Sequence, residues 1–496
     1  MKTNQLLTSI LFSFILVLTP LSLAVSTTQT KVDNSTWNYQ YLNVSTSLGT
    51  TDLNSVSPDG LPLCKSASLG NIVCYRPNFI KKAYDFPSTG VLDGSGQTIV
   101  IVDAFGSPTI AADLALFDTI FGIAAPPSFT IFCGNSNTPL DPSTCPHVPI
   151  TSNPKHDVFG WSIETSLDVE YAHAMAPGAD LVLVVSATSS GNSLNDAEAA
   201  AIAAYPGAVF SQSYGIPEIF VHANNAQIMQ AQKNYAAGVA MGDTFLASAG
   251  DTGATFGTSV AMGNFPSSDL HNTAVTGTQG LPYNATGTLK ACAPPARSDP
   301  TIPGICTSGL STYHAPTAAG CVLGRTVPPN CVADGYGGEQ VWNEPSFVVA
   351  TGGAQSLLFG VPSYQSGLGL TARGPDVSYN AAIDGGVLVV YGGFGTPVLF
   401  IVGGTSAGSP QWAGIIALAN QARALASKGP IGDLNPVLYS IYSSPSYATD
   451  FHDITVGNDQ LVGTPVGYSA GAGYDLASGL GTPDVTNLIA DLVAAP

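Results

Sequence analysis

Apolar segments alternate with helical patterns along the first half of the chain. The apolar run 96–103, with its polar end, predicts a buried strand, and the segment 109–121 after it has helical spacing. Further segments continue this alternation, with strands at 179–185, 209–211 and 244–249 and helices at 79–84, 195–204 and 223–237. Strands that alternate with helices predict an α/β fold, with a parallel sheet and helices on both of its faces.

A serine lies at a predicted strand-to-helix turn near the C-terminal end. The stretch 403–410 reads Gly-Gly-Thr-Ser-Ala-Gly-Ser-Pro, between the apolar strand 398–402 and the helical pattern 411–426. Free N–H groups at a helix N-terminus favour negative charge, and they can hold the oxyanion that forms in acyl transfer. Ser406 is therefore a candidate nucleophile. A glycine-rich turn with a capping serine or threonine is the other interpretation.

Two carboxylates interrupt an otherwise apolar stripe in the predicted helix 158–177. Trp161, Glu164, Asp168, Tyr171 and Met175 recur at helical spacing, so the two acids, four residues apart, share one face. Acidic groups on an inward face are costly unless they are paired, protonated or functional. Two that lie this close should share a proton and titrate together. The alternative is that this acidic edge faces water.

Two further groups of residues have candidate chemistry. Asp251 lies between glycines in 247–254, where an aspartate is most often a turn residue. Near the C-terminus, His452-Asp453-Ile454 is followed by 471–475, Gly-Ala-Gly-Tyr-Asp. Carboxylates, with glycines that leave the backbone carbonyls accessible, suit a hard cation that prefers oxygen ligands, although the spacing is not that of an EF-hand.

Composition limits the possible partners and the compartment. Lys and Arg number 14 against 33 Asp and Glu, a net charge of -19, which argues against a nucleic-acid partner. Only 9% of residues are charged, and this favours work in acid, because few basic groups remain to repel one another once carboxylates are protonated. Residues 1–24 resemble a cleavable secretory signal, and 25–74 form a polar arm. The mature chain should be soluble, without a membrane partner.

The cysteines agree with export. Cys64 lies close to Cys74 and Cys133 close to Cys145, and four more fall in a loop-like, Gly- and Pro-rich stretch at about 264–338, namely Cys292, Cys306, Cys321 and Cys331. Without CxxC pairs or companion histidines, disulfides are expected rather than zinc. The connectivity of the last four stays open. Sequons at Asn34, Asn43 and Asn284 are possible glycosylation sites.

The motifs together resemble one enzyme family. Gly-Gly-Thr-Ser-Ala at 403–407 is similar to the serine motif of the sedolisins, the serine-carboxyl peptidases of the subtilisin clan. Glu164-x-x-x-Asp168, with Ala-Pro at 176–177, and Ser-Ala-Gly-Asp-Thr-Gly at 248–253 also resemble that family. The resemblance covers 75–496, interrupted by the cysteine-rich stretch, and it implies a subtilisin-like fold.

The resemblance also implies roles for single residues. Ser406 would be the nucleophile, Glu164 its general base, Asp168 the partner of that base, and Asp251 a donor in the oxyanion hole. One structural calcium ion would be held by the carboxylates of Asp453 and Asp475 and the carbonyls of Ile454, Gly471 and Gly473. The implied protein is a secreted, acid-active endopeptidase, a monomer that acts on proteins or peptides. Tripeptidyl-peptidases also occur in the family, and no residue here separates the two activities.

Two other functions compete with this interpretation. A true subtilisin would use Asp103, a histidine and Ser406, but its His-Gly-Thr-His string is missing around all seven histidines, which are His147, His156, His173, His222, His271, His314 and His452. An inactive, calcium-stabilised surface module is the other alternative. One departure from the family is that only 25–74 lie between the signal and the peptidase pattern, where sedolisins usually have a large pro-domain, so the mature N-terminus is open.

Overall fold

The computed structural model describes most of the residues after the predicted arm. The described residues are 40–41, 44–47, 63–66, 70–87, 92–135, 138–141, 156–221, 225–280 and 336–496. The predicted signal at 1–24, the asparagines of the three sequons and the cysteines from Cys145 onward lie outside them. Within these ranges, no helix combines the length and the apolar character that a membrane crossing requires.

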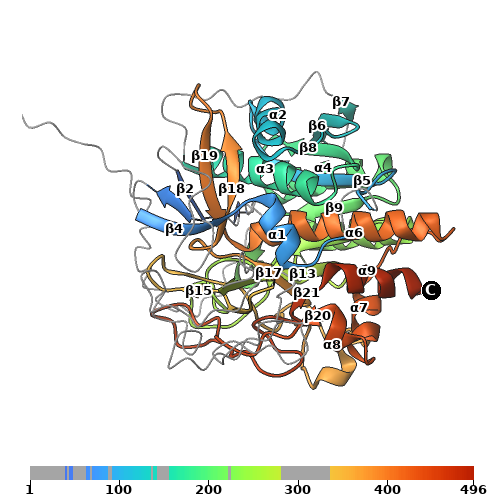
Figure 1. Ribbon diagram of the computed structural model, residues 1–496. Coiled ribbons are helices and arrows are strands. Elements are labelled where there is room, and N and C mark those ends of the chain that lie inside the picture. The colour runs from blue at the N-terminus through green and yellow to red at the C-terminus, as the bar shows by residue number, and fades with distance from the viewer. Residues whose placement is uncertain are drawn as a thin grey trace, which may run out of the picture.

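A mainly parallel sheet forms the centre of the molecule (Figure 1). Its strands, in spatial order, are β14 (Glu339–Val341), β13 (Asn272–Gly280), β11 (Thr244–Ser248), β9 (Val209–Gln212), β5 (Thr98–Ala104), β8 (Asp180–Ser186), β6 (Phe129–Asn135) and β7 (Thr138–Asp141). A further strand, β17 (Val377–Asn380), also pairs with β13. All pairings are parallel except those of β7 and β14. The predicted α/β fold is confirmed.

Successive residues of the central strands enter two different cores. In β5, Ile99 and Ile101 pack into one core, and Val100 and Val102 into the other. Because both faces of the sheet are covered, residues that point to either face are apolar. The strand sequence is therefore apolar throughout. The first core includes residues of α1 (Pro77–Ala83), α2 (Ile110–Phe121), α3 (His156–Met175), α6 (Gly408–Leu425), α7 (Leu434–Tyr442) and α9 (Val485–Ala494). The second includes residues of α4 (Gly191–Ala204) and α5 (Ala226–Ala240).

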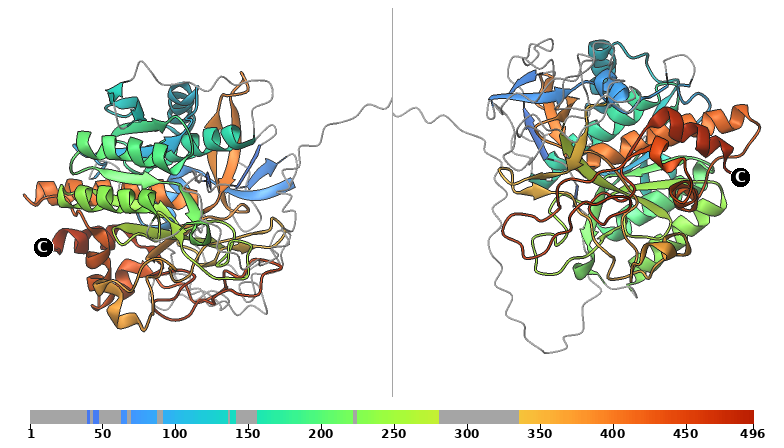
Figure 2. Two further views of the ribbon diagram at one scale, coloured as in Figure 1. Left: turned by 180° about the vertical axis from the view of Figure 1, so that it is seen from behind. Right: turned by 60° about the horizontal axis from the view of Figure 1, so that its bottom comes forward.

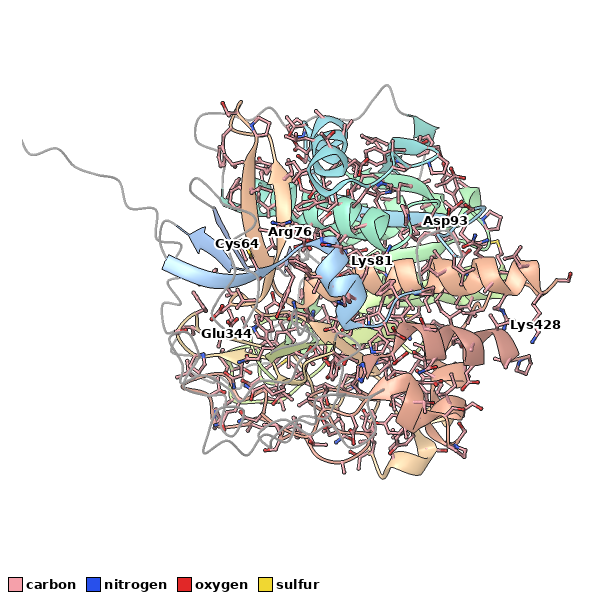
Figure 3. All side chains as sticks on the ribbon, viewed as in Figure 1. Cys64, Arg76, Lys81, Asp93, Glu344 and Lys428 are labelled. Atoms are coloured by element: carbon pink, nitrogen blue, oxygen red, sulfur yellow. A yellow bond between two sulfur atoms is a disulfide. The ribbon has the colours of Figure 1, made fainter. Side chains whose placement is uncertain are left out.

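Helices α3 and α6 come into close contact at Gly414. A Cβ added to Gly414 of α6 would lie 2.3 Å from the Cβ of Met175 in α3, so only glycine fits there. At the same end of α3, Lys81 of α1, labelled in Figure 3, donates to the carbonyls of Ala174 (3.0 Å) and Met175 (3.3 Å). A cation at a helix C-terminus pairs with carbonyls that have no helical partner. These contacts fix the position of α3 relative to α6.

The described strands of the predicted N-terminal arm pair into sheets of the folded domain. A second sheet has the order β2 (Val44–Ser47), β19 (Val398–Gly403), β18 (Gly386–Tyr391), β4 (Gly70–Tyr75) and β3 (Leu63–Ser66). In both views of Figure 2 the blue N-terminal strands lie beside the orange β18 and β19. The expected disulfide joins Cys64 to Cys74 within this sheet, and Cys133 is also disulfide-bonded. A third sheet has the order β1 (Gln40–Tyr41), β10 (Tyr214–Pro217) and β12 (Asn264–Phe265).

The prediction of a loop-like stretch at 264–338 is wrong for its first part. Residues 272–280 form β13, a strand of the central sheet. Its sequence, Asn-Thr-Ala-Val-Thr-Gly-Thr-Gln-Gly, looks like a loop because it is polar, but its hydroxyls have partners in the core. Thr276 donates to the carbonyl of Val377, and Thr278 to the carboxylate of Glu339. Residues 281–335, including four cysteines, lie outside the described part.

Shorter elements complete the C-terminal part of the fold. They are β15 (Asn343–Glu344), β16 (Val349–Ala350), α8 (Tyr447–Asp450), β20 (Phe451–His452) and β21 (Thr482–Pro483).

Candidate active site

Ser406 lies at the turn between β19 and α6, as the sequence predicts. Gly404, with φ of 107°, makes the sharp turn after β19, in a backbone region that favours glycine. Ser406 follows within the short 3₁₀ turn Thr405–Ala407, directly before α6, and it is fully buried. Its hydroxyl donates a long hydrogen bond of 3.4 Å to the carbonyl of Ser213.

Asp251 contacts the residue next to Ser406. The segment 249–251 leaves the end of β11, and Oδ1 of Asp251 accepts hydrogen bonds from the Thr405 N–H (2.8 Å) and hydroxyl (2.9 Å). Burial raises the pKa of Asp251 to about 7, against the opposing effect of the Thr405 hydrogen bonds. Its Oδ2 is buried and has no hydrogen-bond partner among the described residues. A proton on Oδ2 would make it a donor next to the nucleophile.

Glu164 and Asp168 lie on the inner face of α3. Both are fully buried, so the alternative in which they face water is wrong. The charge of Glu164 acts on Asp168, and two acidic groups that interact this closely titrate as one coupled pair. Burial, followed by the charges of Asp103 and Glu164, holds the pKa of Asp168 well above its ordinary value.

Ser213 connects the carboxyl pair to the nucleophile. This residue lies between β9 and β10, and its hydroxyl donates to Oδ1 of Asp168 (2.8 Å). Its carbonyl accepts the hydrogen bond from Ser406. Hydrogen bonds and the backbone at 405–406 thus connect Asp168 through Ser213 to Ser406 and on to Asp251, and Glu164 lies one helical turn from Asp168 on α3. The sequence indicates Ser213 only as part of the family-like strand end 211–215.

Asp103 is an additional member of this acidic cluster. It lies on β5, fully buried, and burial raises its pKa to about 7. Its charge is the largest electrostatic influence on Asp168 after burial itself. Asp103 thus lies beside Asp168. From the sequence, a role for Asp103 was expected only in the competing subtilisin interpretation.

Histidine does not join this cluster within the described part of the chain. His173 contacts Asp118 (3.1 Å), His271 contacts Asp433 (3.6 Å), and His452 stacks on Tyr336. The His156 side chain and the other three histidines lie outside what the structure describes. The described geometry therefore gives Ser406 carboxyl neighbours instead of an imidazole.

The buried carboxyls predict a protein that is more stable in acid than at neutral pH. Burial raises the pKa of several carboxyls in the described core, to about 7 for Asp103, Asp251 and Glu344 and to about 8 for Glu198. Each binds its proton more tightly when folded, so its contribution is complete below its ordinary pKa near 4 and is lost as the pH rises through 7 to 8. The melting temperature should fall by at least about 5 °C between pH 4.5 and pH 8.

Calorimetry over that pH range measures this effect. Glu198 is a buried residue of α4, a helix of the second core, and Glu198→Gln removes one of the titrating groups, so that variant should show a smaller fall. A melting temperature that stays constant or rises towards pH 8 contradicts the prediction.

The second predicted constellation is also assembled in space. The N–H of Gly473 donates to Asp453 Oδ2, and the N–H of Gly471 donates to Asp475 Oδ2, each at 2.9 Å. Ile454, next to Asp453, is buried. Two carboxylates and a glycine-rich loop supply oxygen donors of the kind that calcium prefers. The described residues contain no cluster of three or more His, Cys, Asp or Glu side chains suited to a metal, so carbonyl ligands would have to complete the coordination.

Comparison with known proteins shows what this chain is similar to. No family model matches it. Kumamolisin from Bacillus sp. (strain MN-32) is 28% identical over 422 residues, 82% of this chain, and sedolisin from Pseudomonas sp. (strain 101) is 26% identical over 435 residues, 86% of this chain. The chain spans 62% of the length of each of these two curated relatives. The solved structure of Pseudomonas sedolisin, a serine-carboxyl proteinase complexed with two molecules of pseudo-iodotyrostatin, matches with a TM-score of 0.61 at 24% identity, over 85% of this chain and 98% of that chain.

Proposed function

We propose that this chain, whose similarity to kumamolisin and sedolisin supports membership of the sedolisin family, is a secreted, acid-active endopeptidase that cleaves peptide bonds through an acyl-enzyme on Ser406. One observation supports the proposal above all others. Three buried carboxyls lie on segments that contact the Ser406 turn at a helix N-terminus, Glu164 and Asp168 on α3 and Asp251 through Thr405. This combination provides both a base and a neutral donor for acyl transfer at low pH.

The carboxyl pair acts as the base. Glu164 takes the proton from the Ser406 hydroxyl as oxygen attacks the peptide carbonyl, and it returns that proton to the leaving amine. For this step the hydroxyl turns from the Ser213 carbonyl towards Glu164. Asp168, held by the Ser213 hydroxyl one helical turn from Glu164, shares a proton with Glu164 and orients it. A carboxylate base works in acid, where an imidazole with a pKa near 6.5 is already protonated.

Asp251 is protonated in this mechanism, whereas Glu164 has to be ionised to act as the base. Its raised pKa keeps it neutral in acid, and a neutral carboxyl can donate from Oδ2 to the oxyanion of the tetrahedral intermediate. Its Oδ1 is held by Thr405, so the donor keeps a fixed position next to Ser406. Once ionised, Asp251 would repel the oxyanion, and the reaction would slow as the pH approaches neutrality.

Digestion of an unfolded protein at acid pH tests this function. Cleavage should continue in the presence of pepstatin, which inhibits two-aspartate peptidases, and it should be absent in Ser406→Ala. Mass spectrometry of the products then separates the two activities of the family, because internal fragments indicate an endopeptidase and successive tripeptides a tripeptidyl-peptidase. A folded, exported protein without acid proteolysis would instead support the inactive surface module.

We also propose one structural calcium ion at the C-terminal loops. The carboxylates of Asp453 and Asp475 and the carbonyls of Ile454, Gly471 and Gly473 would hold it. When bound, the ion neutralises two neighbouring carboxylates and cross-links β20 to the loop 471–475. Its role is in stability, because Asp453 accepts hydrogen bonds from Tyr447 and Gly473, and Asp475 from Gly471, Ala477 and Ser478, none of them near the Ser406 turn in sequence.

Removal of calcium should lower the melting temperature. A ligand that binds only the native state stabilises it by about 2.7 kcal/mol at one hundred times its Kd. A chelator, or Asp453→Ala, should therefore lower the melting temperature by several degrees, and added calcium should restore the parent but not the variant. Asp491→Ala, on α9, is the matched control and should keep the response. A parent whose melting temperature is unaffected by chelator and by calcium contradicts the site.

A further inference from the structure

We propose that Ser248 is a positioning residue for catalysis, because its hydroxyl fixes the peptide group whose N–H faces the oxyanion. This inference rests on the proposed peptidase function and concerns the second donor of the oxyanion hole. As Oγ of Ser406 attacks a peptide carbonyl, the oxyanion forms within reach of the backbone N–H of the same residue. Asp251 is one donor to this oxyanion, and the Ser406 N–H is the other.

The Ser406 N–H is available because of its place in the chain. Ser406 is the second residue of the 3₁₀ turn Thr405–Ala407, which leads directly into α6. The first N–H groups of a helical segment have no carbonyl in a preceding turn to bond, and they favour negative charge. In a planar trans peptide the C=O and the N–H point in opposite directions. A hydrogen bond that fixes the Thr405 carbonyl therefore also fixes the direction of the Ser406 N–H.

The polar groups of Thr405 are all bound by one segment, 248–251. The N–H and the hydroxyl of Thr405 donate to Oδ1 of Asp251, and the hydroxyl also accepts from the Gly250 N–H at 3.0 Å. The carbonyl of Thr405 accepts from the Ser248 hydroxyl at 3.1 Å. Ser248 is thus the residue of this segment that acts on the carbonyl, whereas Gly250 and Asp251 act on the other groups.

A serine is unusual at the position that Ser248 occupies. Ser248 is the last residue of β11 and is fully buried. In this strand Phe245 packs into the second core and Leu246 into the first, which includes residues of α6. Because side chains alternate along a strand, Ser248 shares the face of Leu246. An apolar side chain is expected there, since a buried hydroxyl is costly unless it is hydrogen-bonded.

The Thr405 carbonyl does not depend on Ser248 for a hydrogen-bond partner. The Gly408 N–H already donates to it as part of the 3₁₀ turn. The Ser248 hydroxyl adds a second bond, which ties the peptide group to the strand end that also carries Asp251. Both donors of the oxyanion hole are held in this way by one segment. Such restraint matters because the donors act on the transition state only when their geometry is set before the reaction.

Replacement of Ser248 tests the inference in the active enzyme at acid pH. Ser248→Ala should lower kcat for peptide hydrolysis by at least about tenfold and leave KM within about twofold, because the N–H acts on the oxyanion and not on the bound peptide. The alkaline limb of kcat/KM should stay where it is in the parent, because Asp251 keeps both of its bonds from Thr405. Ser248→Cys, which is close in size and has a weaker donor, should give an intermediate kcat.

Thr244→Val is the matched control. Thr244 is the first residue of the same strand, is buried, and donates its hydroxyl to a backbone carbonyl as well, that of Gly432 at 2.8 Å. Both variants lose one buried hydrogen bond, so their melting temperatures should fall by similar amounts. Thr244→Val should nevertheless keep kcat within about twofold of the parent, because nothing at Ser406 changes.

A peptide aldehyde gives a second measurement, which reports on the oxyanion position. Ser406 Oγ adds to the aldehyde carbon and the hydroxyl proton passes to the aldehyde oxygen, so that a hemiacetal forms with its oxygen at this position. The Ki of the aldehyde should rise in Ser248→Ala by the factor by which kcat/KM falls. The corresponding peptide alcohol cannot form this bond, and its Ki should not change.

The outcomes separate this inference from the function on which it rests. Parent-like kcat in the folded Ser248 variants, or an unchanged Ki for the aldehyde, overturns the role of Ser248. Equal losses of kcat in Ser248→Ala and Thr244→Val overturn it as well, because the loss then follows from stability. If Ser248→Ala does not fold, the kcat and KM of Ser248→Cys decide. A parent that hydrolyses no peptide at acid pH contradicts the proposed peptidase function instead.

Discussion

Replacement of Ser406 by Ala should lower kcat for peptide hydrolysis by about 10⁶-fold, the loss seen when a serine peptidase loses its nucleophile. The variant lacks the oxygen that forms the acyl-enzyme, and the other hydroxyl of this turn, on Thr405, donates to Asp251. Its KM should change little, because the Ser406 hydroxyl acts in the covalent step and not in holding the peptide. Steady-state kinetics at acid pH, on a peptide or an unfolded protein, measure both quantities.

Ser409 supplies the matched control for this experiment. It is three residues further along, in α6, fully buried, and its hydroxyl contacts that of Ser211 at 3.0 Å. Ser409→Ala thus removes a comparable buried hydroxyl without touching the nucleophile. It should cost stability, by about 1 kcal/mol for one net hydrogen bond, and keep kcat within a few-fold. Activity in Ser406→Ala close to that of the parent would show that the nucleophile is assigned to the wrong residue.

Replacement of Asp251 and replacement of Glu164 should change the pH dependence of kcat/KM in different ways. Burial raises the pKa of Asp251 to about 7, so in the parent the rate should fall as the pH rises towards and through that value. Asp251→Asn donates a hydrogen bond at every pH and carries no charge, so its alkaline limb should move up or flatten. Glu164→Gln cannot accept the Ser406 proton, and it should lose about 10⁴-fold at every pH.

Glu344 provides a control with a similar pKa away from the site. Burial raises its pKa to about 7 as well, but its partners are Trp342 and the backbone N–H groups of Ile383 and Asp384. Glu344→Gln should therefore keep the alkaline limb of the parent. Profiles from strong acid to neutrality for the parent and the three variants are needed. A parent optimum near neutrality, or an Asp251→Asn profile with the parent's limb, would contradict the oxyanion role.

The sequence identified best those residues whose chemistry is unusual for the segment of the chain in which they lie. Glu164 and Asp168 are noticeable because acids are rare on an apolar helix face, and the structure buries both. The turn at Ser406 is noticeable because glycines separate a strand pattern from a helix pattern, and it lies where predicted. Such local conflicts depend only on neighbours in the chain, which a single sequence contains.

The features that the sequence did not predict depend on pairing over long distances. The polar strand β13 has no apolar alternation, because its threonines bond to Val377 and Glu339 from other segments. The N-terminal segment has no periodicity of its own either, and its strands are defined by β10, β18 and β19. Asp103 looks like an ordinary strand end until α3 lies beside it. Each of these features depends on residues that are far away in the sequence.

The sheet that supports the nucleophile turn also has a consequence for how the protein folds. It joins the two ends of the chain: β19 pairs with β2, and the Val73 N–H donates to Asp384, 311 residues away. Contacts between such distant residues require the closure of very long loops, which slows folding. At roughly 5–20 residues per second, synthesis of the intervening chain alone takes tens of seconds. The sheet behind the nucleophile turn therefore cannot close before most of the polypeptide has been made, and the chain remains inactive during the period in which it is also least protected from proteolysis.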